Sequence, residues 1–194
     1  MAELLSRLKP VETSHSEDRV YFAALPDANA KADIARLGSS VRRDYRLADE
    51  PFDLDRLHVS LCFVGKHADM TEAILARARK AASALRARPF AVAFNCLTRF
   101  SKGVGKRPLV LIGDDGVGGL RALHMSLGAA MQDVGFAARA REAYTPHVTL
   151  MYGTLPIDEQ MIRPIGWTVR DFVLVHSVHG KRRHIELDRW PLRS

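Results

Sequence analysis

Two short segments of the chain carry the same arrangement of side chains that can do chemistry. Residues 58–61 read HVSL and residues 147–150 read HVTL, so each segment places a hydroxyl two positions after a histidine. Alternate residues of a β-strand share a face, which points the imidazole and the hydroxyl of each segment the same way. Two such strands lying side by side would surround one cleft with His58, Ser60, His147 and Thr149.

Paired histidines suit a reaction that takes up one proton and delivers another. One of the two groups must be neutral while the other is charged, and imidazole, with a reference pKa of about 6.5, can fill either role near neutral pH. Each such proton transfer typically contributes a factor of about 10² to 10⁴ in rate. Nearby hydroxyls can donate hydrogen bonds to negative charge that develops in the transition state, without a metal ion.

A third segment, residues 124–127 (HMSL), matches the same pattern. It lies among Leu120, Leu123, Leu127 and Met131, whose spacing is that of a helix, and on a helix His124 and Ser126 face nearly opposite ways. We therefore set it aside. The other two segments share a strand context and a following glycine, Gly65 or Gly153.

The elements that must position these residues alternate between strand-like and helix-like patterns. Strands are predicted at 19–25, 57–64, 90–100, 108–112, 147–152, 169–178 and 183–187, and helices at 28–45, 70–88 and 120–134. This order is not the strict alternation of a parallel doubly wound sheet, so an α+β fold with antiparallel sheets is expected. The similarity of residues 56–65 and 145–153 suggests two related halves.

Within the strand at 57–64 the apolar residues alternate. One face is expected to carry Leu57, Val59, Leu61 and Phe63, and the other His58, Ser60, Cys62 and Val64. Cys62 and Cys96 lie in apolar stretches and are expected to be reduced, buried thiols.

The composition is that of a folded domain of 194 residues with a net charge of +7. The polar residues 1–18 are expected to form a flexible lead, and 19–194 a single domain. No apolar run is long enough for a membrane span or signal peptide, which favours a cytoplasmic protein with no membrane partner. We also expect a monomer. The positive charge suits a polyanionic partner.

The twin motifs resemble those of the 2H phosphoesterases, a family marked by two H-x-[ST]-hydrophobic segments in two pseudo-symmetric lobes. The ending at 173–192 is similar to the last hairpin of the 2′-5′ RNA ligase or RNA 2′,3′-cyclic phosphodiesterase branch. The resemblance implies a bilobal fold in which each lobe is an antiparallel sheet with helices packed outside, with the active-site cleft between the lobes. It implies neither metal nor cofactor.

The same resemblance implies an RNA or nucleotide substrate ending in a 2′,3′-cyclic phosphate. His58 would be the general acid that protonates the 3′ oxygen and His147 the general base for water, which gives a 2′-phosphate. The reverse reaction, with a 5′-hydroxyl in place of water, would ligate RNA through a 2′-5′ bond. Ser60 and Thr149 would bind the phosphate oxygens.

The chain departs from that branch at one position. Many members have an arginine five residues after the second motif histidine, where this chain has Tyr152. We therefore expect a different substrate end, or a phosphate-binding cation supplied from elsewhere. The loop cations Lys102, Lys106 and Arg107, and the turn cations Lys181, Arg182 and Arg183, are candidates for RNA phosphates, although such side chains are usually only solvated.

Several further interpretations stay open. Tyr144, Phe63 and Phe100 either stack on a base or belong to the core. His176, His179 and His184 are not expected to bind zinc, because positions three apart on a strand face opposite sides. The rival functions are an RNA-binding module without turnover and a phosphodiesterase for a small cyclic nucleotide.

Overall fold

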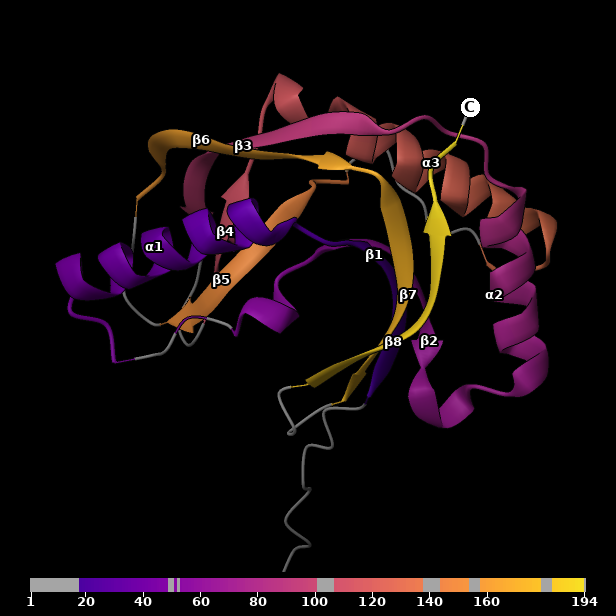
Figure 1. The fold of residues 1–194 in the computed structure, drawn as a ribbon. Coiled ribbons are helices and arrows are strands. Elements are labelled where there is room, and N and C mark those ends of the chain that lie inside the picture. Colours follow the sequence, from indigo (N-terminus) through magenta and orange to yellow (C-terminus); the bar gives the residue numbers. More distant parts are fainter. Residues whose placement is uncertain are drawn as a thin grey trace, which may run out of the picture.

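The fold is a single antiparallel sheet of eight strands with three α-helices, seen in a computed structural model that describes residues 18–48, 51, 53–100, 107–137, 144–153, 158–178 and 183–193. The expected flexible lead, except Asp18, lies outside these residues. In order across the sheet the strands run β6-β3-β4-β5-β2-β1-β7-β8. Figure 1 shows that the sheet curls strongly from one edge to the other.

The strands are β1 (Arg19–Ala24), β2 (Val59–Lys66), β3 (Phe90–Arg99), β4 (Arg107–Ile112), β5 (His147–Gly153), β6 (Gln160–Val169), β7 (Asp171–Val178) and β8 (Arg183–Pro191). The α-helices are α1 (Ala28–Asp44), α2 (Glu72–Ala84) and α3 (Gly118–Asp133). Short 3₁₀ helices lie at Leu54–Arg56, His67–Asp69 and Asp115–Val117. The expected α+β class is therefore confirmed. Among the described residues no helix is long and apolar enough to cross a membrane.

Two four-stranded halves meet in the middle of the sheet. One half is β6-β3-β4-β5 and the other is β2-β1-β7-β8, and all of their strand pairs are antiparallel. The halves join where β2 pairs with β5, at Val59 and Val148. These are the strands of the two histidine motifs, so the motifs lie at the junction of the two expected lobes.

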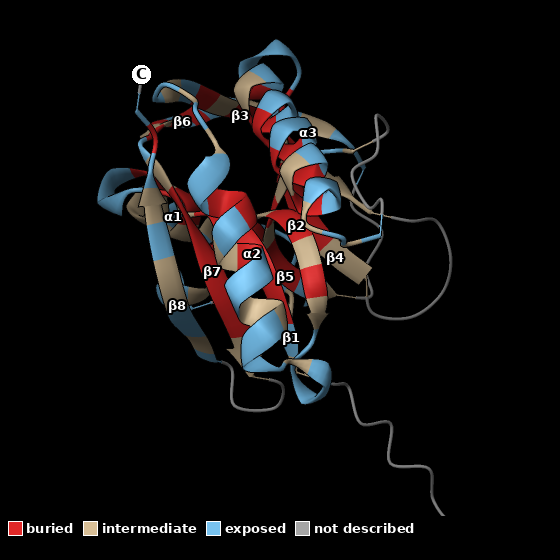
Figure 2. Ribbon diagram, turned by 90° about the vertical axis from the view of Figure 1, so that its right-hand side faces the viewer, coloured by how far each residue is buried: buried red, intermediate tan, exposed pale blue. Residues whose placement is uncertain are grey.

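One face of the sheet carries the main core. Helix α1 is capped at its N-terminus by Asp27, whose side chain accepts a hydrogen bond from the backbone N–H of Ala30. The helix buries Ile34 and Val41 at helical spacing. It packs on β5 and β6, whereas α2 and α3 pack on each other and α3 lies against β2. Figure 2 shows the buried faces of these elements turned inward. Burial of each large apolar side chain contributes about 1.5–3 kcal/mol.

The opposite face carries a smaller apolar cluster. It consists of Tyr21, Ala23, Val173 and Val175, with Leu25 and Phe63 packed against it. On β1 and β7 these residues alternate with Val20, Phe22, Phe172 and Leu174, which belong to the main core. The two faces of this half of the sheet are therefore distinguished by strand alternation.

The sequence prediction missed the edge strand β6. Its sequence, QMIRPIGWTV, contains Pro164 and Gly166, which are typical of a loop. An edge strand tolerates proline because one side of its backbone pairs with no neighbour. The helix expected at 70–88 is also shorter, because Leu85 already has extended backbone angles.

Candidate active site

The two histidine motifs lie side by side on neighbouring strands. Val59 pairs with Val148 in an antiparallel ladder, and such a ladder sets His58 opposite Thr149 and Ser60 opposite His147. The two valines are fully buried in the main core, so the four flanking residues share the other face. Diagonal neighbours in such a ladder have Cα atoms about 7–8 Å apart, which brings two imidazoles around one small space.

Each imidazole is oriented by the backbone carbonyl two residues before it. The Nδ1–H of His58 donates to the carbonyl oxygen of Arg56 at 2.7 Å, and the Nδ1–H of His147 donates to that of Thr145 at 2.9 Å. A carbonyl can only accept, so Nδ1 carries the proton in both neutral rings. The Nε2 atoms are therefore left for proton transfer. Nε2 of His58 lies 3.1 Å from Oγ of Ser60.

Both imidazoles are held neutral at pH 7. The pKa of His58 is lowered to about 4, mainly by burial and also by the charges of His147 and Arg56, against the opposing hydrogen bond to the Arg56 carbonyl. Burial also lowers the pKa of His147, opposed by its hydrogen bond to Thr145. Because the charge of His147 acts on His58, the two rings belong to one electrostatic site.

A β-bulge changes which side chains of β5 share a face with His147. The pairing with β4 shifts between Leu109 and Val110, so Leu150 and Met151 are both buried in the core. Because the bulge inserts one extra residue, Leu150, every later residue of β5 faces the side opposite to that expected from simple alternation. Tyr152, five positions after His147, is therefore brought to the same face as the histidine, with 46% of its surface exposed.

Strand β2 also contains a bulge, and it changes the alternation of faces that the sequence predicted for residues 57–64. Its pairing with β1 shifts between Phe22 and Ala23, and Leu61 and Cys62 are both buried in the core. Phe63 therefore packs against the cluster of Tyr21 on the face of the sheet that carries the two histidines, which we call the motif face. Cys62 and Val64 belong to the main core on the other face. The prediction that Phe63 faces away from His58 was wrong. Position five after each motif histidine is aromatic and lies on the motif face.

Three residues beside His58 were not predicted for the site. The ring of Tyr21 lies 5.2 Å from that of His58, and the ring of His184 lies 4.9 Å from it, edge to face. The Tyr21 hydroxyl is 3.3 Å from Nε2 of His184. Burial raises the pKa of Tyr21 to about 12 and lowers that of His184 to about 4; the nearby charge of Arg56 opposes the rise at Tyr21 and adds to the lowering at His184 and His58. Tyr21 and His184 come from segments far from His58 in the chain, so nothing in the sequence indicated that they would contact it. Arg56 is only two positions before His58, which is a signal that the sequence does contain.

The aromatic candidates separate into two groups. Phe100 lies beside His147, with ring centroids 4.5 Å apart. Tyr144 is instead a support for the motif, because its hydroxyl donates to the carbonyl of Ser60 at 2.6 Å and its ring stacks on His124 at 4.0 Å. His124 is buried on α3 and its Nδ1–H donates to the carbonyl of Leu61 at 2.7 Å. It lies on a helix as expected, and it braces β2.

The basic candidates lie elsewhere or outside the described residues. Lys102, Lys106, Lys181, Arg182 and His179 are outside them. Arg107 pairs with Gly153, next to the pair of Pro108 and Tyr152, and strand alternation puts its side chain on the face opposite to Tyr152.

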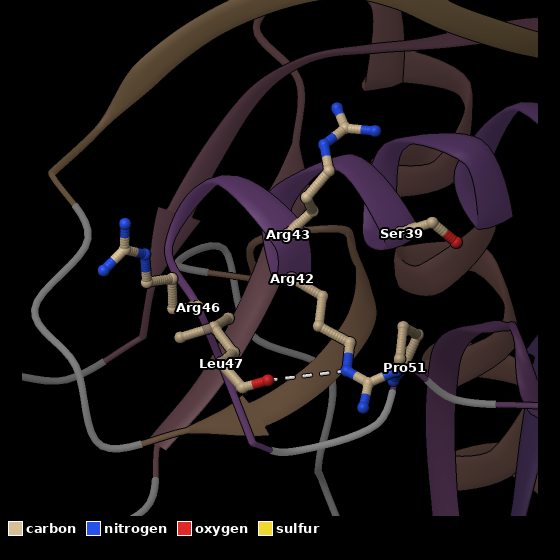
Figure 3. A pocket seen from close by; sticks show the side chains of 6 residues that line it. All are labelled: Ser39, Arg42, Arg43, Arg46, Leu47 and Pro51. Carbon is tan, nitrogen blue, oxygen red and sulfur yellow. Dashed lines mark hydrogen bonds between the residues drawn. The ribbon is translucent and has the colours of Figure 1, made fainter.

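Two hollows lie away from the motifs. One, of about 350 Å³, is lined by Ser39, Arg42, Arg43, Arg46, Leu47 and Pro51 at the end of α1 (Figure 3). The other is lined by Asp33, Arg36, Leu37 and residues 162–166. Neither is lined by a motif residue. Among the described residues, one group has the donors and spacing to hold a metal ion: Asp18, His67 and His176.

The chain is similar to proteins of one superfamily. The model of the 2'-5' RNA ligase superfamily matches residues 25–181. The crystal structure of TT0787 of Thermus thermophilus is 21% identical, with a TM-score of 0.74 over 90% of this chain and 98% of that one. Apo LigT of E. coli is 22% identical, with a TM-score of 0.71 over 92% and 100%. LigT complexed with 3'-AMP has a TM-score of 0.69 at 22% identity over the same shares. No curated protein matches the sequence.

Proposed function

Because the chain belongs to the 2'-5' RNA ligase superfamily, which supports a phosphoesterase activity, we propose that it hydrolyses RNA 2′,3′-cyclic phosphate ends to 2′-phosphates. The observation that carries this proposal is the pairing of the two motif strands at Val59 and Val148. It sets two neutral imidazoles on one face with their Nε2 atoms available. A cyclic phosphate between them would meet a proton acceptor on one side and a proton donor on the other.

The reaction needs two proton transfers and no redox change. Nε2 of His147 takes a proton from water, the water oxygen bonds to phosphorus, and the bond from phosphorus to the 3′ oxygen breaks. Nε2–H of His58 protonates the departing 3′ oxygen, which leaves a 3′-hydroxyl and a 2′-phosphate. Proton exchange with solvent then restores both rings. The assignment of acid and base follows the family resemblance, because the two rings are oriented alike.

The acid must be charged when the substrate is bound. A phosphate anion beside His58 favours the imidazolium and would raise its pKa from the low value of the free site. Ser60 lies within hydrogen-bonding distance of His58, and Thr149 lies opposite His58 in the ladder through the paired valines. Their hydroxyls would donate to the non-bridging oxygens and stabilise the extra charge of the transition state.

Arg56 would supply the phosphate-binding cation. In many members of the 2′-5′ RNA ligase branch this cation is an arginine at the position that Tyr152 occupies in this chain. The charge of Arg56 acts on Tyr21, His58 and His184, so it lies within electrostatic range of a phosphate held by His58. A guanidinium can bind two phosphate oxygens at once. Tyr152 would then contact the nucleoside, together with Phe100 beside His147, because exposed aromatic rings stack on bases.

A nucleotide or RNA is the substrate class that these features favour. The net charge of +7 attracts polyanions, and the similar protein LigT has been crystallised with 3'-AMP. A 2′,3′-cyclic phosphate end combines a base, a ribose and a single reactive phosphorus. The reverse reaction with a 5′-hydroxyl would give 2′-5′ ligation at the same site.

The test is hydrolysis in the presence of a chelator, with the product identified by mass and by its resistance to 3′-phosphate-specific enzymes. His58→Gln and His147→Gln should each lose a factor of at least about 10² in kcat. Ser60→Ala should lose roughly tenfold or more. Ser126→Ala is its matched control, because Ser126 is an exposed hydroxyl in the helical HMSL segment. Full activity in both histidine variants would contradict the mechanism.

The same assay separates the rival functions. Equal kcat/KM for 2′,3′-cyclic mononucleotides and for RNA would favour a small cyclic nucleotide as substrate. Salt-dependent RNA binding by wild type and both histidine variants, with no turnover at any pH, would identify an RNA-binding module.

A further inference from the structure

A second cluster of histidine and carboxylate groups lies away from the proposed active site. Nε2 of His176 and Oδ2 of Asp18 are 2.9 Å apart, although the residues are 158 positions apart in the chain. The ring of His67 stacks on that of His176, with centroids 3.7 Å apart and planes 5° apart. One donor atom from each residue lies within 4.8 Å of the other two.

The cluster is on the face of the sheet opposite to the histidine motifs. Along β7, Phe172 and Leu174 face the main core while Val173 and Val175 face the cluster of Tyr21. Alternation therefore puts His176 on the core face, where its partner in the ladder is Val20. His58 contacts Tyr21 on the other face, so the two groups of histidines do not share a site.

The backbone holds the three residues together independently of their side chains. The backbone N–H of His67 donates to the carbonyl of Asp18 at 2.8 Å, which ties the end of β2 to the start of β1. The pairing of β1 with β7 in turn sets Val20 opposite His176. The register of these three strands therefore fixes the positions of all three residues.

The donors define the kind of ion that would fit. Two imidazole nitrogens and one carboxylate oxygen suit zinc and related first-row divalent ions, whereas magnesium and calcium prefer oxygen donors alone. Bonds of about 2.0–2.2 Å in a tetrahedral site set neighbouring donors about 3.3–3.5 Å apart. His176 and Asp18 are already closer than this. His67 is exposed, so rotation of its side chain can complete the approach.

We propose that Asp18, His67 and His176 form a binding site for a divalent transition metal of the zinc type, with a water molecule as the fourth ligand. The ion would join the start of β1, the end of β2 and the end of β7, and would stabilise this end of the three neighbouring strands. The site is structural and takes no part in the proposed hydrolysis, because it lies on the opposite face.

Equilibrium dialysis of the full chain against Zn²⁺, and visible absorption with Co²⁺, test the proposal. Wild type should bind one equivalent of either ion, with tetrahedral Co²⁺ bands and a raised Tm, and Mg²⁺ should neither bind nor compete. His67→Ala and Asp18→Asn should each weaken binding at least about tenfold. Asp69→Asn is the matched control, since Asp69 is an exposed acid in the 3₁₀ helix that begins at His67, and it should bind like wild type.

Two results would overturn the site. One is no binding by wild type at about 100 µM metal, well above the range of a built zinc site. The other is binding that both variants retain, which would place the ion on other histidines. Both variants can be checked for folding by their metal-free Tm, because His67 is exposed and Asp18→Asn preserves shape. Hydrolysis in chelator is read separately, so the proposed function and the metal site fail independently.

Discussion

The chemistry of single residues in this protein depends on which nitrogen each imidazole offers. Backbone carbonyls accept hydrogen bonds from the Nδ1–H groups of His58 and His147, so Nε2 is the nitrogen of each ring that is left for proton transfer. Burial then lowers both pKa values. Both rings are therefore neutral in the free site, and a bound phosphate would supply the negative charge that stabilises an imidazolium.

The low pKa of His58 has a testable consequence for catalysis. In the free site His58 loses its protonated, acidic form as pH rises through its pKa of about 4. His147 reaches its neutral, basic form as pH rises through its own lowered pKa. The profile of kcat/KM, which reports the free enzyme, should therefore have its optimum below about pH 6.5. The profile of kcat should have its optimum at higher pH, because bound phosphate raises the pKa of His58.

Steady-state kinetics from about pH 4 to 9 in a chelator measure both profiles. A pH-independent kcat/KM across this range, under conditions in which chemistry limits the rate, would contradict paired acid-base catalysis. Coincident optima for kcat and kcat/KM would show that phosphate does not act on His58.

At the scale of the elements, two bulges and the packing of α3 determine which side chains of β2 and β5 lie on the motif face and how β2 is held. A bulge in β2 and another in β5 each bring an aromatic residue, Phe63 or Tyr152, to the motif face. Behind β2, α3 supports the strand through the hydrogen bond from His124 to the carbonyl of Leu61. The position of α3 therefore matters to the site although this helix lies on the core face of the sheet.

The start of α3 offers a matched pair of glycines to test this support. A Cβ added at Gly119 would lie 2.3 Å from a ring carbon of Phe90, whereas one added at Gly118 would meet nothing within 4 Å. Gly119→Ala should lower the free energy of unfolding by about 1–3 kcal/mol, because the helix must shift against β3. Gly118→Ala should leave it unchanged or raise it by up to about 1 kcal/mol.

Urea unfolding of both variants gives the comparison. Gly119→Ala should also lower kcat more than Gly118→Ala, since a shifted α3 disturbs β2 through His124. Equal stability of the two variants would mean that Phe90 yields without cost.

At the scale of the whole molecule, stability should depend on the histidines of the motif face. Burial lowers the pKa of His184 to about 4, and the charges of His58 and Arg56 act in the same direction. Both His58 and His184 thus have pKa values in the folded protein below the reference value of about 6.5 for an unfolded chain. Their neutral forms favour folding above about pH 6.5, and protonation favours unfolding as pH falls toward about 4.

The free energy of unfolding should therefore fall by about 1–3 kcal/mol between about pH 6.5 and 4 from this pair, in addition to the effect of the carboxylates. Denaturant unfolding at a series of pH values measures the slope. His184→Gln should reduce the slope, because it removes one titrating group and its repulsion of His58. An unchanged slope in His184→Gln would show that this ring is already solvated.

Local sequence pattern was enough to predict the features that depend on the spacing of side chains within one element. A histidine, a valine and a hydroxyl residue in alternation place their side chains on known faces of a strand, whatever else the chain does. The HxS and HxT motifs, the strands that carry them, the rejection of His124 and the α+β class all follow from patterns of this kind.

Features that depend on strand register and on distant segments became visible only in three dimensions. A bulge is set by the pairing of two strands and not by either sequence, so Phe63 was placed on the wrong face. Tyr21 and His184 reach His58, and Asp18 reaches His67 and His176, because the sheet order β2-β1-β7-β8 makes neighbours of residues far apart in the chain. Side-chain spacing along one strand carries no information about such neighbours.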